Sequence, residues 1–434
     1  MIWLRRRNIV VALLSLLIIW VNTQWMNPSL PVPKPGVPGI NTVYADSAMS
    51  SRSAGSAACL SCHRAICDSL SLTAHYLSSS PASAASIKGS FRAGRNHIVY
   101  NEHMEVVLEK KGKKFLQSAW FNGSVYESEA FDIVIGSGRK GQSYLYWDSN
   151  RLFQLPVSYY TPADSWCNSP GYPTNLIYFN KQVPGECMEC HATSARVLSL
   201  DNGATLFDKN SIVYGIDCER CHGPGAAHLA WHTAHPGEKE GRDIIHWRQL
   251  GRQQRLDACA LCHSGFRKEI LPSFSFRVGD TLAQFSTPNY SPDSTATLDV
   301  HGNQYGLLTT SKCFSSSSMD CSSCHNVHVD EFNRAGLFSR RCMNCHDQPG
   351  QAAQMGAPAR QSGCTFAPVK ELKLENNCID CHMPALPSQK ILLQLSGGAT
   401  PLHDMIRTHH IGIYPDISAK YISAAKAAGP RSGR

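Results

Sequence analysis

The chain has 434 residues, of which 42% are hydrophobic and 17% are charged, an ordinary composition for a globular protein of two or three domains. Its formal charge is +8 at pH 7, yet no run of Lys and Arg that could follow a phosphate backbone is present, so a nucleic-acid partner is not expected. The unusual counts are 18 Cys and 19 His. Cysteine at that level is a hazard in the cytosol, so these residues are expected to serve disulfides, metal binding or cofactor attachment.

The N-terminus has the features of an export signal. Arg5, Arg6 and Arg7 precede an apolar run from Ile9 to Val21, which is too short to span a bilayer comfortably. Five prolines then predict an extended tether. We interpret residues 1–48 as a signal peptide, or alternatively an uncleaved N-terminal anchor, followed by this Pro-rich tether. The rest of the chain is then periplasmic or otherwise extracytoplasmic, and any membrane contact or cell-surface attachment would run through the anchor.

One pentapeptide, C-x-x-C-H, occurs seven times and uses 14 of the 18 Cys. Two thiols separated by two residues can both form thioethers with the vinyl groups along one porphyrin edge, and the following His then supplies the proximal nitrogen to the iron. Zinc sites and redox dithiols also use C-x-x-C, but they do not require that His. The repeat therefore predicts seven covalently bound haems of the c type, each with its iron.

The seven copies are numbered here as motifs 1 to 7 in chain order. The expected attachment residues are Cys59, Cys62, Cys187, Cys190, Cys218, Cys221, Cys259, Cys262, Cys321, Cys324, Cys342, Cys345, Cys378 and Cys381. The expected proximal ligands are His63, His191, His222, His263, His325, His346 and His382. Each oxidised haem adds a charge of about −1 through its propionates, so seven haems explain most of the apparent basicity of the chain.

The spacing of the motifs divides the chain. Motif 1 stands alone, and the other six fall between Cys187 and His382. We expect a first haem module at 49–96, a β-rich insert at 97–165, a six-haem core at 166–413 and a flexible tail at 414–434. Alternating β-branched and aromatic residues, broken by glycines, predict antiparallel strands near 97–160. The expected fold class is a multihaem cytochrome c: mainly short α-helices and loops packed around haems, with that small antiparallel β insert.

The second axial ligands are expected among twelve histidines outside the motifs, of which seven would be needed if every iron had His on both faces. His75 follows motif 1 by twelve residues on a predicted helix. His228 follows the Gly-Pro-Gly turn after motif 3, which lets the chain double back under a porphyrin. His328 comes three residues after the His of motif 5, so we expect it to reach a different haem.

Four further histidines complete the predicted set of distal ligands. His301 precedes a Gly-Asn turn before motif 5, and His246 stands beside Trp247 between motifs 3 and 4. One or two ligands are expected from the group His403, His409 and His410, of which we select His403 and His410. The adjacent residues His409 and His410 point in different directions on any regular element, so we do not expect both to reach the same iron.

Other histidines and methionines have weaker claims. His232 and His235 continue the helical face of His228, where a further ligand and a surface or propionate-bonding role stay open. We interpret His97 and His103 as surface residues. A Met ligand would raise the potential of its haem, but no Met is placed distinctively.

Four Cys lie outside the motifs, and four thiols in an oxidising compartment allow three pairings. Our hypothesis is that Cys313 pairs with Cys364 to brace motifs 5 and 6, and that Cys67 pairs with Cys167 across the insert.

Several stretches resemble the multihaem cytochrome family that includes tetrahaem carriers of nitrifying bacteria and hydroxylamine-oxidoreductase-like enzymes. They are Gly215–His228 with its C-E-R-C-H-G-P-G run, Cys321–His328, Cys378–Pro384, and, in the insert, Ile135–Gly138, Gly141–Leu145, Gln154–Pro156, Trp166 and Pro170–Tyr172. The resemblance covers most of residues 57–412. It implies mainly helical haem packing in stacked and perpendicular pairs, mostly with two His ligands. Catalytic relatives usually keep one haem open or use C-x-x-C-K, and this chain has neither that variant nor an eighth motif.

Two main functions are open at this point. The first is electron transfer between redox partners, such as another cytochrome or a quinol-oxidising membrane module on one side and a terminal reductase or outer-surface acceptor on the other, as in anaerobic respiration. The second is a multihaem oxidoreductase acting on a small nitrogen or sulfur compound at one open haem, with no catalytic residue identified. A weaker third alternative is a structural subunit of a cytochrome filament, with the insert as docking surface.

Overall fold

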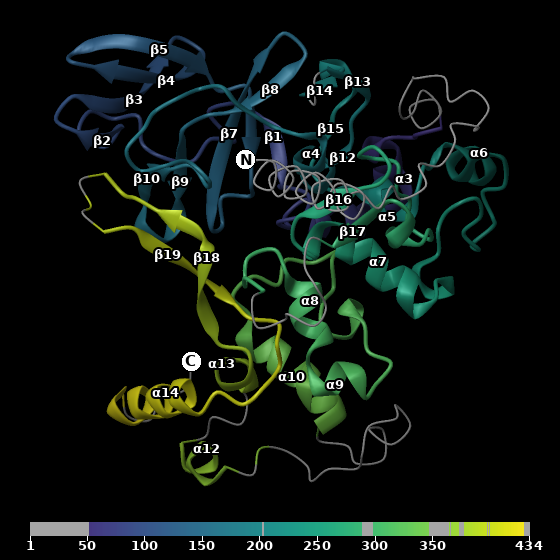
Figure 1. Cartoon of the computed structure of the whole chain (residues 1–434). Helices are drawn as coiled ribbons and strands as arrows, with labels where there is room; N and C mark the ends of the chain where they lie inside the picture. The colour runs from purple at the N-terminus through teal and green to yellow at the C-terminus, as the bar shows by residue number, and fades with distance from the viewer. Residues whose placement is uncertain are drawn as a thin grey trace, which may run out of the picture. The chain divides into compact units, whose positions relative to one another are not determined.

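The computed structural model describes residues 52–201, 204–288, 298–346, 364, 366–372, 377–396, 398 and 400–428 (Figure 1). The chain divides into two units, Met1–Thr42 and Val43–Arg434, and every described residue belongs to the second. The expected signal or anchor at 1–48 lies outside the described residues. Within them, no helix combines the length and apolar character that a membrane span requires.

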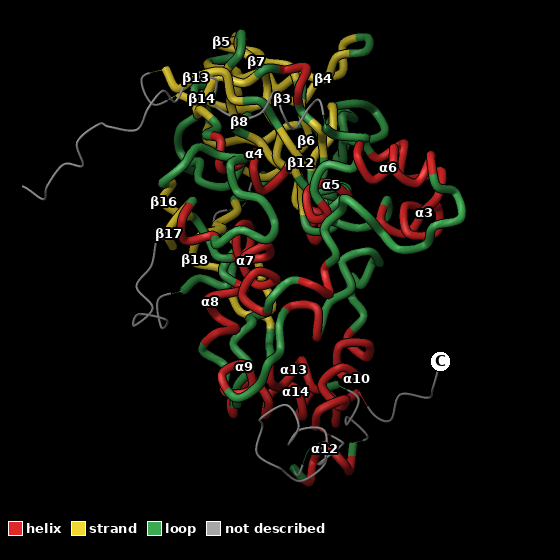
Figure 2. The backbone as a smooth tube through the Cα atoms, turned by 90° about the vertical axis from the view of Figure 1, so that its right-hand side faces the viewer, coloured by secondary structure: helices red, strands yellow, loops and turns green. Residues whose placement is uncertain are grey.

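Two antiparallel sheets form the N-terminal part of the described chain (Figures 1 and 2). The four-stranded sheet has the order β2-β3-β4-β5, with bounds His97–Asn101, Met104–Lys111, Lys114–Phe121 and Ser124–Ala130. In the seven-stranded sheet the order is β1-β6-β7-β8-β11, and β9 and β10 are added through β7. Its strands are β1 Ser79–Pro81, β6 Ile133–Ile135, β7 Gly141–Asp148, β8 Arg151–Gln154, β9 Val157–Tyr160, β10 Ser165–Asn168 and β11 Lys181–Gln182.

The seven-stranded sheet separates two apolar cores because successive side chains of a strand point to opposite faces. Tyr144 and Tyr146 of β7 join the cluster shared with β3 and β4 of the other sheet. Leu145 between them joins a second cluster, which includes Met188 of the helix that carries motif 2. The buried Gln117 of β4 bonds both backbone groups of Val157 in β9, at 2.7 and 2.9 Å, and so ties the two sheets together.

The helices are short, and six of those described carry a motif; α3 precedes the sheets and the others come after them. The described helices are α3 Ser56–Leu70, α4 Gly185–His191, α5 Cys218–His222, α6 Ala226–Ala234, α7 Arg252–His263, α8 Gln304–Thr309, α9 Lys312–Ser315, α10 Ala335–His346, α12 Ala367–Glu371, α13 Cys378–His382 and α14 Pro415–Ala428. The 3₁₀ turns are η1 Thr161–Ala163, η2 Lys209–Ser211, η3 Trp247–Gln249, η4 Leu282–Gln284 and η6 Cys321–Ser323. The apolar clusters beside α7 and α8 are much smaller than those of the sheets.

The expected fold class is wrong in its balance of helix and strand. Strands begin at Ser79 and end at Gln182 in the two large sheets, and four two-stranded sheets lie among the described helices of the expected haem core. These are β12 Ala192–Ser194 with β15 Val213–Tyr214, β13 Val197–Asp201 with β14 Ala204–Phe207, β16 Arg267–Glu269 with β17 Ser286–Pro288, and β18 Ala385–Leu393 with β19 Leu402–Arg407. A C-x-x-C-H motif fixes about one helical turn and leaves the segments between motifs free to pair as hairpins.

The C-terminal segment also differs from expectation. Residues 414–434 were expected to form a flexible tail, but Pro415–Ala428 form α14, which packs against α13 and buries Ile422. Alanines weaken the 3.6-residue apolar periodicity of this short amphipathic helix, so composition alone predicts a frayed end.

Two polar contacts attach the sheets to the haem-motif part. Asp404 of β19 is buried and accepts bonds of 2.9 Å from Lys140 Nζ and from the Tyr160 hydroxyl. Arg139, beside Lys140, contacts Asp330 after motif 5 and the carbonyl of Leu72 after α3. The sheets are therefore fixed to segments that follow motifs 1, 5 and 7.

Replacing Gly215 by Ala should destabilise the protein more than replacing Gly112 by Ala. Both glycines have positive φ, +72° and +63°, so both variants bear a backbone cost of about 1–3 kcal/mol. A Cβ at Gly215 would in addition lie 2.1 Å from the Tyr76 carbonyl oxygen, whereas nothing lies within 4 Å of one at Gly112. Overpacking of this kind costs about 1–3 kcal/mol more. Thermal unfolding followed by circular dichroism tests this, and equal melting temperatures for the two variants would contradict the close approach.

Candidate haem-binding sites

The motifs lie on helical turns, which explains how their three functional residues converge. Motif 1 lies within α3, motifs 3 and 7 are α5 and α13, motifs 2, 4 and 6 end α4, α7 and α10, and motif 5 begins at η6. Residues three and four apart share one face of a helix, so the second Cys and the His lie on the same side as the first Cys. Each motif therefore presents two sulfurs and one imidazole to the same space.

Four motif histidines each face a histidine from a distant segment. The ring centres are 6.3 Å apart for His63 and His228, 6.1 Å for His222 and His328, 6.2 Å for His325 and His409, and 6.0 Å for His263 and His75. The first three pairs are nearly parallel, with interplanar angles of 20°, 19° and 22°, and the last is nearly perpendicular at 83°. No other described histidine outside the motifs makes such a ring contact with a motif histidine.

These separations fit two imidazoles on opposite faces of one iron. With metal–nitrogen bonds of about 2.0–2.1 Å and roughly 1.2 Å from each ring nitrogen to its ring centre, the two centres would lie about 6.4 Å apart. Direct stacking of two rings would bring the centres closer, as in His235 and Trp231 at 3.8 Å. The donor set also suits haem, because each pair has two motif sulfurs beside it.

Hydrogen bonds orient several of these rings. Nδ1 of His222, His228 and His382 donates to the backbone carbonyls of Ile245, Arg242 and Gly412 at 2.9, 2.8 and 2.9 Å. A carbonyl only accepts, so Nδ1 carries the proton and Nε2 is left as the ligand atom. Such bonds fix the tautomer and ring orientation that iron ligation needs.

Burial keeps two of the facing rings, His75 and His409, neutral. It lowers the pKa of His75 to about 4, with smaller contributions from His263 and His325, and it lowers that of His409 to about 4, with contributions from the same two rings. A histidine must be unprotonated to bind a metal, so both are in the form that ligation requires.

The large sheet positions motif 2. Ser78 and Ser79, at the start of β1, both donate their hydroxyls to the His191 carbonyl, at 3.0 and 2.6 Å. Burial is the main cause that lowers the pKa of His191, and His263 and His301 contribute. His301 therefore lies near His191, although the rings make no direct contact.

Three other predicted ligands have their ring nitrogens engaged elsewhere. His246 donates Nε2 to the Gly241 carbonyl at 2.7 Å, and His403 donates Nδ1 to the Ser388 carbonyl at 2.6 Å. His410 Nδ1 bonds the Thr310 hydroxyl at 2.7 Å. None of the three faces a motif histidine within the described residues.

His409 belongs to the group of three histidines from which one or two ligands were expected, but it was not among the two selected. It faces His325, whereas His410, which was selected in its place, turns toward Thr310. Adjacent residues of an extended segment point to opposite sides, so only one of the two could face this site. Nothing in the local sequence says which one, because the choice depends on the contact of residues 409–411 with Ser311.

Cysteines of different motifs touch one another. Four pairs of cysteine side chains from different motifs are neighbours: Cys59 and Cys218, Cys190 and Cys262, Cys259 and Cys321, and Cys342 and Cys378. The corresponding helices α4 and α7, α7 and η6, and α10 and α13 also pack together. Motif 1 is thus adjacent to motif 3, motif 2 to motif 4, motif 4 to motif 5, and motif 6 to motif 7.

Neither proposed disulfide is formed among the described residues, where no two cysteines are bridged. Cys167 is buried in β10 with its Sγ 3.6 Å from the Ser158 carbonyl, in the sheet part of the chain. Cys67 lies on α3, near Cys59 and Cys218. Cys313 and Cys364 lie near cysteines of different motifs, Cys345 and Cys381.

Large apolar side chains are exposed next to several motifs. Phe266, three residues after His263, is 77% exposed, and Ile66, three residues after His63, is 48% exposed. Val327 and Val329 follow motif 5 in the same way. Covering one such side chain with an apolar surface is worth about 1.5–3 kcal/mol, so these positions suit contact with a porphyrin plane.

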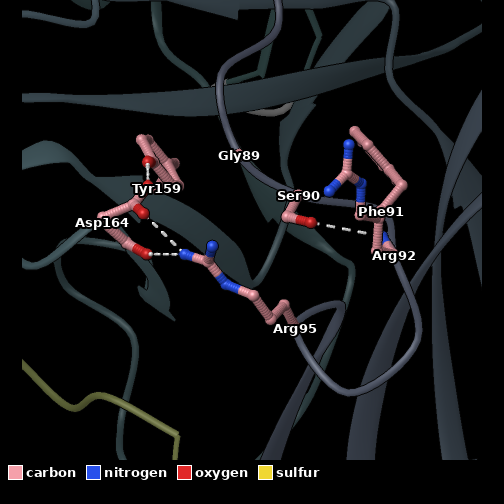
Figure 3. A pocket seen from close by; sticks show the side chains of 7 residues that line it. All are labelled: Gly89, Ser90, Phe91, Arg92, Arg95, Tyr159 and Asp164. Carbon is pink, nitrogen blue, oxygen red and sulfur yellow. Dashed lines mark hydrogen bonds and ion pairs between the residues drawn. The ribbon is translucent and has the colours of Figure 1, made fainter.

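A separate pocket of about 440 Å³ lies in the sheet part (Figure 3). Its Arg95 pairs with Asp164 at 2.6 Å, and the Tyr159 hydroxyl also donates to Asp164. The lining residues are Gly89, Ser90, Phe91, Arg92, Arg95, Tyr159 and Asp164, with none from a C-x-x-C-H motif. This pocket is therefore distinct from the candidate haem sites.

Comparisons with known proteins agree with the haem assignment. The family described as "Cytochrome c554 and c-prime" matches residues 177–223, which include motifs 2 and 3. Among solved structures, the chain is similar to one titled "Crystal Structure of Outer Cell Wall Cytochrome OcwA", with a TM-score of 0.51 and 15% identity over 88% of this chain and 84% of that one. At this identity the likeness concerns the fold. No curated protein matches the chain. The repeated motif, the family match and the shared fold together support a multihaem c-type cytochrome.

Replacing His409 by Ala in the haem-loaded protein should convert one low-spin iron to the high-spin form. The reason is that His409 faces the motif 5 histidine, His325, at the separation expected of two axial ligands. Electron paramagnetic resonance of the oxidised protein measures the change. The matched control is His103→Ala, since His103 is an exposed residue of the β2–β3 turn paired with Glu102. An unchanged spectrum for His409→Ala, with a new high-spin signal for His410→Ala instead, would show that the assignment is wrong.

Proposed function

We propose that the chain is an extracytoplasmic electron-transfer protein with seven covalently bound haems, most of them held by a histidine on each face. The observation that carries the proposal is the set of four histidine pairs whose ring centres lie 6.0–6.3 Å apart, each including the His of a C-x-x-C-H motif. Ordinary aromatic pairs also reach this separation, as Phe91 and Phe131 do at 6.1 Å, so the support comes from the partners: each pair joins the His of a C-x-x-C-H motif to a His from a distant segment.

The chain's own residues would hold and orient the cofactors. The 14 motif cysteines supply the thioether sulfurs, and the seven motif histidines supply one axial nitrogen each. When bound, haem supplies a one-electron iron couple whose potential depends on axial ligands, burial and nearby charge. The second axial nitrogens come from His228, His328, His75 and His409 for motifs 1, 3, 4 and 5.

The remaining motifs have less complete support. His301 is the proposed partner of His191 in motif 2, since the two lie near each other. His403 and His410 are the candidates for motifs 6 and 7, each with Nδ1 engaged and Nε2 left for a metal. His246 uses Nε2 for the Gly241 carbonyl, so we assign it to no motif.

The contacts between cysteines of different motifs support transfer within the chain. They keep the motifs adjacent in three groups, 1–3, 2–4–5 and 6–7, and we call these groups of adjacent sites together the relay. Adjacent sites allow an electron to pass from one iron to the next without a dissociable carrier. Donor and acceptor are proposed to be other redox proteins, such as a quinol-oxidising membrane module or another cytochrome and a terminal reductase.

The proposed location outside the cytoplasm has two supports. One is the signal-like sequence of residues 1–48, and the other is the similar fold of a cytochrome whose title places it in the outer cell wall. Covalent haem attachment at this many motifs also agrees with an oxidising compartment, where free thiols would otherwise be at risk.

One observation favours the alternative, an oxidoreductase for a small nitrogen or sulfur compound. Within the described residues, neither His346 of motif 6 nor His382 of motif 7 makes a ring contact with a second histidine. A haem with one free face could bind a small ligand there. Of the two motifs, His382 has its ring oriented by the Gly412 carbonyl.

Mass spectrometry and spectroscopy of the mature protein, produced with a working haem-ligation system, test both functions. We expect a mass increase of seven haems, uptake of seven electrons per chain in a reductive titration, and mostly low-spin ferric signals. A chain without covalent haem contradicts the proposal. A high-spin signal that shifts when nitrite, hydroxylamine or sulfite is added supports the alternative.

A further inference from the structure

The two middle residues of motif 3, Glu219 and Arg220, both make contacts outside their own motif. Arg220 reaches motif 2, where its Nη2 lies 3.6 Å from Glu189 Oε1 and donates to the Glu189 carbonyl at 3.2 Å. Both side chains are only 11% exposed. Glu189 is itself a middle residue of motif 2, so a buried ion pair joins two haem-attachment motifs.

Arg220 also reaches motif 4. Its side chain lies close to the sulfur of Cys262, which in turn neighbours Cys190 of motif 2. The guanidinium of Arg220 therefore lies at the place where motifs 2, 3 and 4 meet.

A strained residue completes this arrangement. Phe274 has φ of +67°, a left-handed conformation that bulky residues rarely adopt. In this conformation its N–H donates to Glu189 Oε1 at 2.6 Å, and its ring lies 5.6 Å from the Arg220 guanidinium carbon. Strain of this kind persists where the surrounding structure imposes it, and it is concentrated at functional sites.

We propose that Arg220 is a positioning residue of the relay that sets the reduction potentials of the haems held by motifs 2 and 4. The proposal rests on the proposed function. A guanidinium stays charged at every relevant pH, and a buried charge is weakly screened by solvent and salt. Reduction adds one negative charge to a haem site, so a nearby fixed positive charge favours the reduced state and raises the potential.

Other charges around the site act in the opposite direction. Glu189 faces Arg220 directly, and Glu186 and Glu269 lie close enough to influence Glu189. Removing Arg220 would leave these carboxylates without that cation, which would lower the potentials further. A stabilising role alone is a weaker explanation, because a buried ion pair often contributes little net stability over apolar residues.

The test compares Arg220→Gln and Arg220→Lys with the wild type by potentiometric titration of the haem-loaded protein, followed by optical spectroscopy. Haem content is first measured by mass, so a wild type without haem refutes the proposed function and not this inference alone. We expect Arg220→Gln to shift at least two haem transitions to lower potential. Arg220→Lys keeps the positive charge, so its haem transitions should stay close to the wild-type potentials.

The matched control is Arg64→Gln. Arg64 directly follows the His of motif 1, but its side chain is 76% exposed and pairs with Asp68 at 3.8 Å, so its charge is screened and no potential should change. If Arg220→Gln fails to load haem, Glu189→Gln takes its place, and removal of this carboxylate should raise the same transitions. Wild-type potentials in a fully loaded Arg220→Gln protein, or lower potentials in Glu189→Gln, would overturn the proposal.

Discussion

The pairing of a motif histidine with a histidine from a distant segment is the interaction on which the haem-motif part of this chain depends. A motif supplies one of the two rings, and the second comes from a segment that is distant in the sequence. His75, which follows motif 1, faces His263 of motif 4, while His228, which follows motif 3, faces His63 of motif 1. Each pair thus acts as a long-range link, which explains how short helices with small apolar clusters can form a defined structure.

The sheets support these links from outside. They hold the two large apolar cores of the described chain, and their first strand fixes the backbone of His191 through two serine hydroxyls. Arg139 and the Lys140–Asp404 pair attach them to segments that follow motifs 1, 5 and 7. The sheet part is therefore better described as a support for the motifs than as a separate docking insert.

The sequence predicts features that depend on local chemistry, such as the motifs. It does not predict which side of an extended segment a residue faces. The motifs themselves are readable because sulfur and imidazole spacing is fixed by one helical turn. The turn after motif 3 directed attention to His228, whose ring centre lies 6.3 Å from that of His63 in the structure. The choice between His409 and His410 depends on which side of an extended segment meets Ser311, which no local pattern encodes. The hairpins β16–β17 and β18–β19 were missed because a motif says nothing about the segments between motifs.

The two middle residues of a C-x-x-C-H motif are not needed for haem attachment, but they lie between the two residues that are, so their contacts act close to the candidate haem site. In motif 3 one of them, Glu219, accepts backbone hydrogen bonds from Ala54 and Gly225 at 2.8 and 2.7 Å and so fixes the segment that enters motif 1. The other, Arg220, meets motifs 2 and 4. One pentapeptide thus contacts two other motifs and the segment that leads into a third, through two side chains of opposite charge. Sequence variation at these two positions can alter assembly and local electrostatics while the thioethers and the axial ligand stay unchanged.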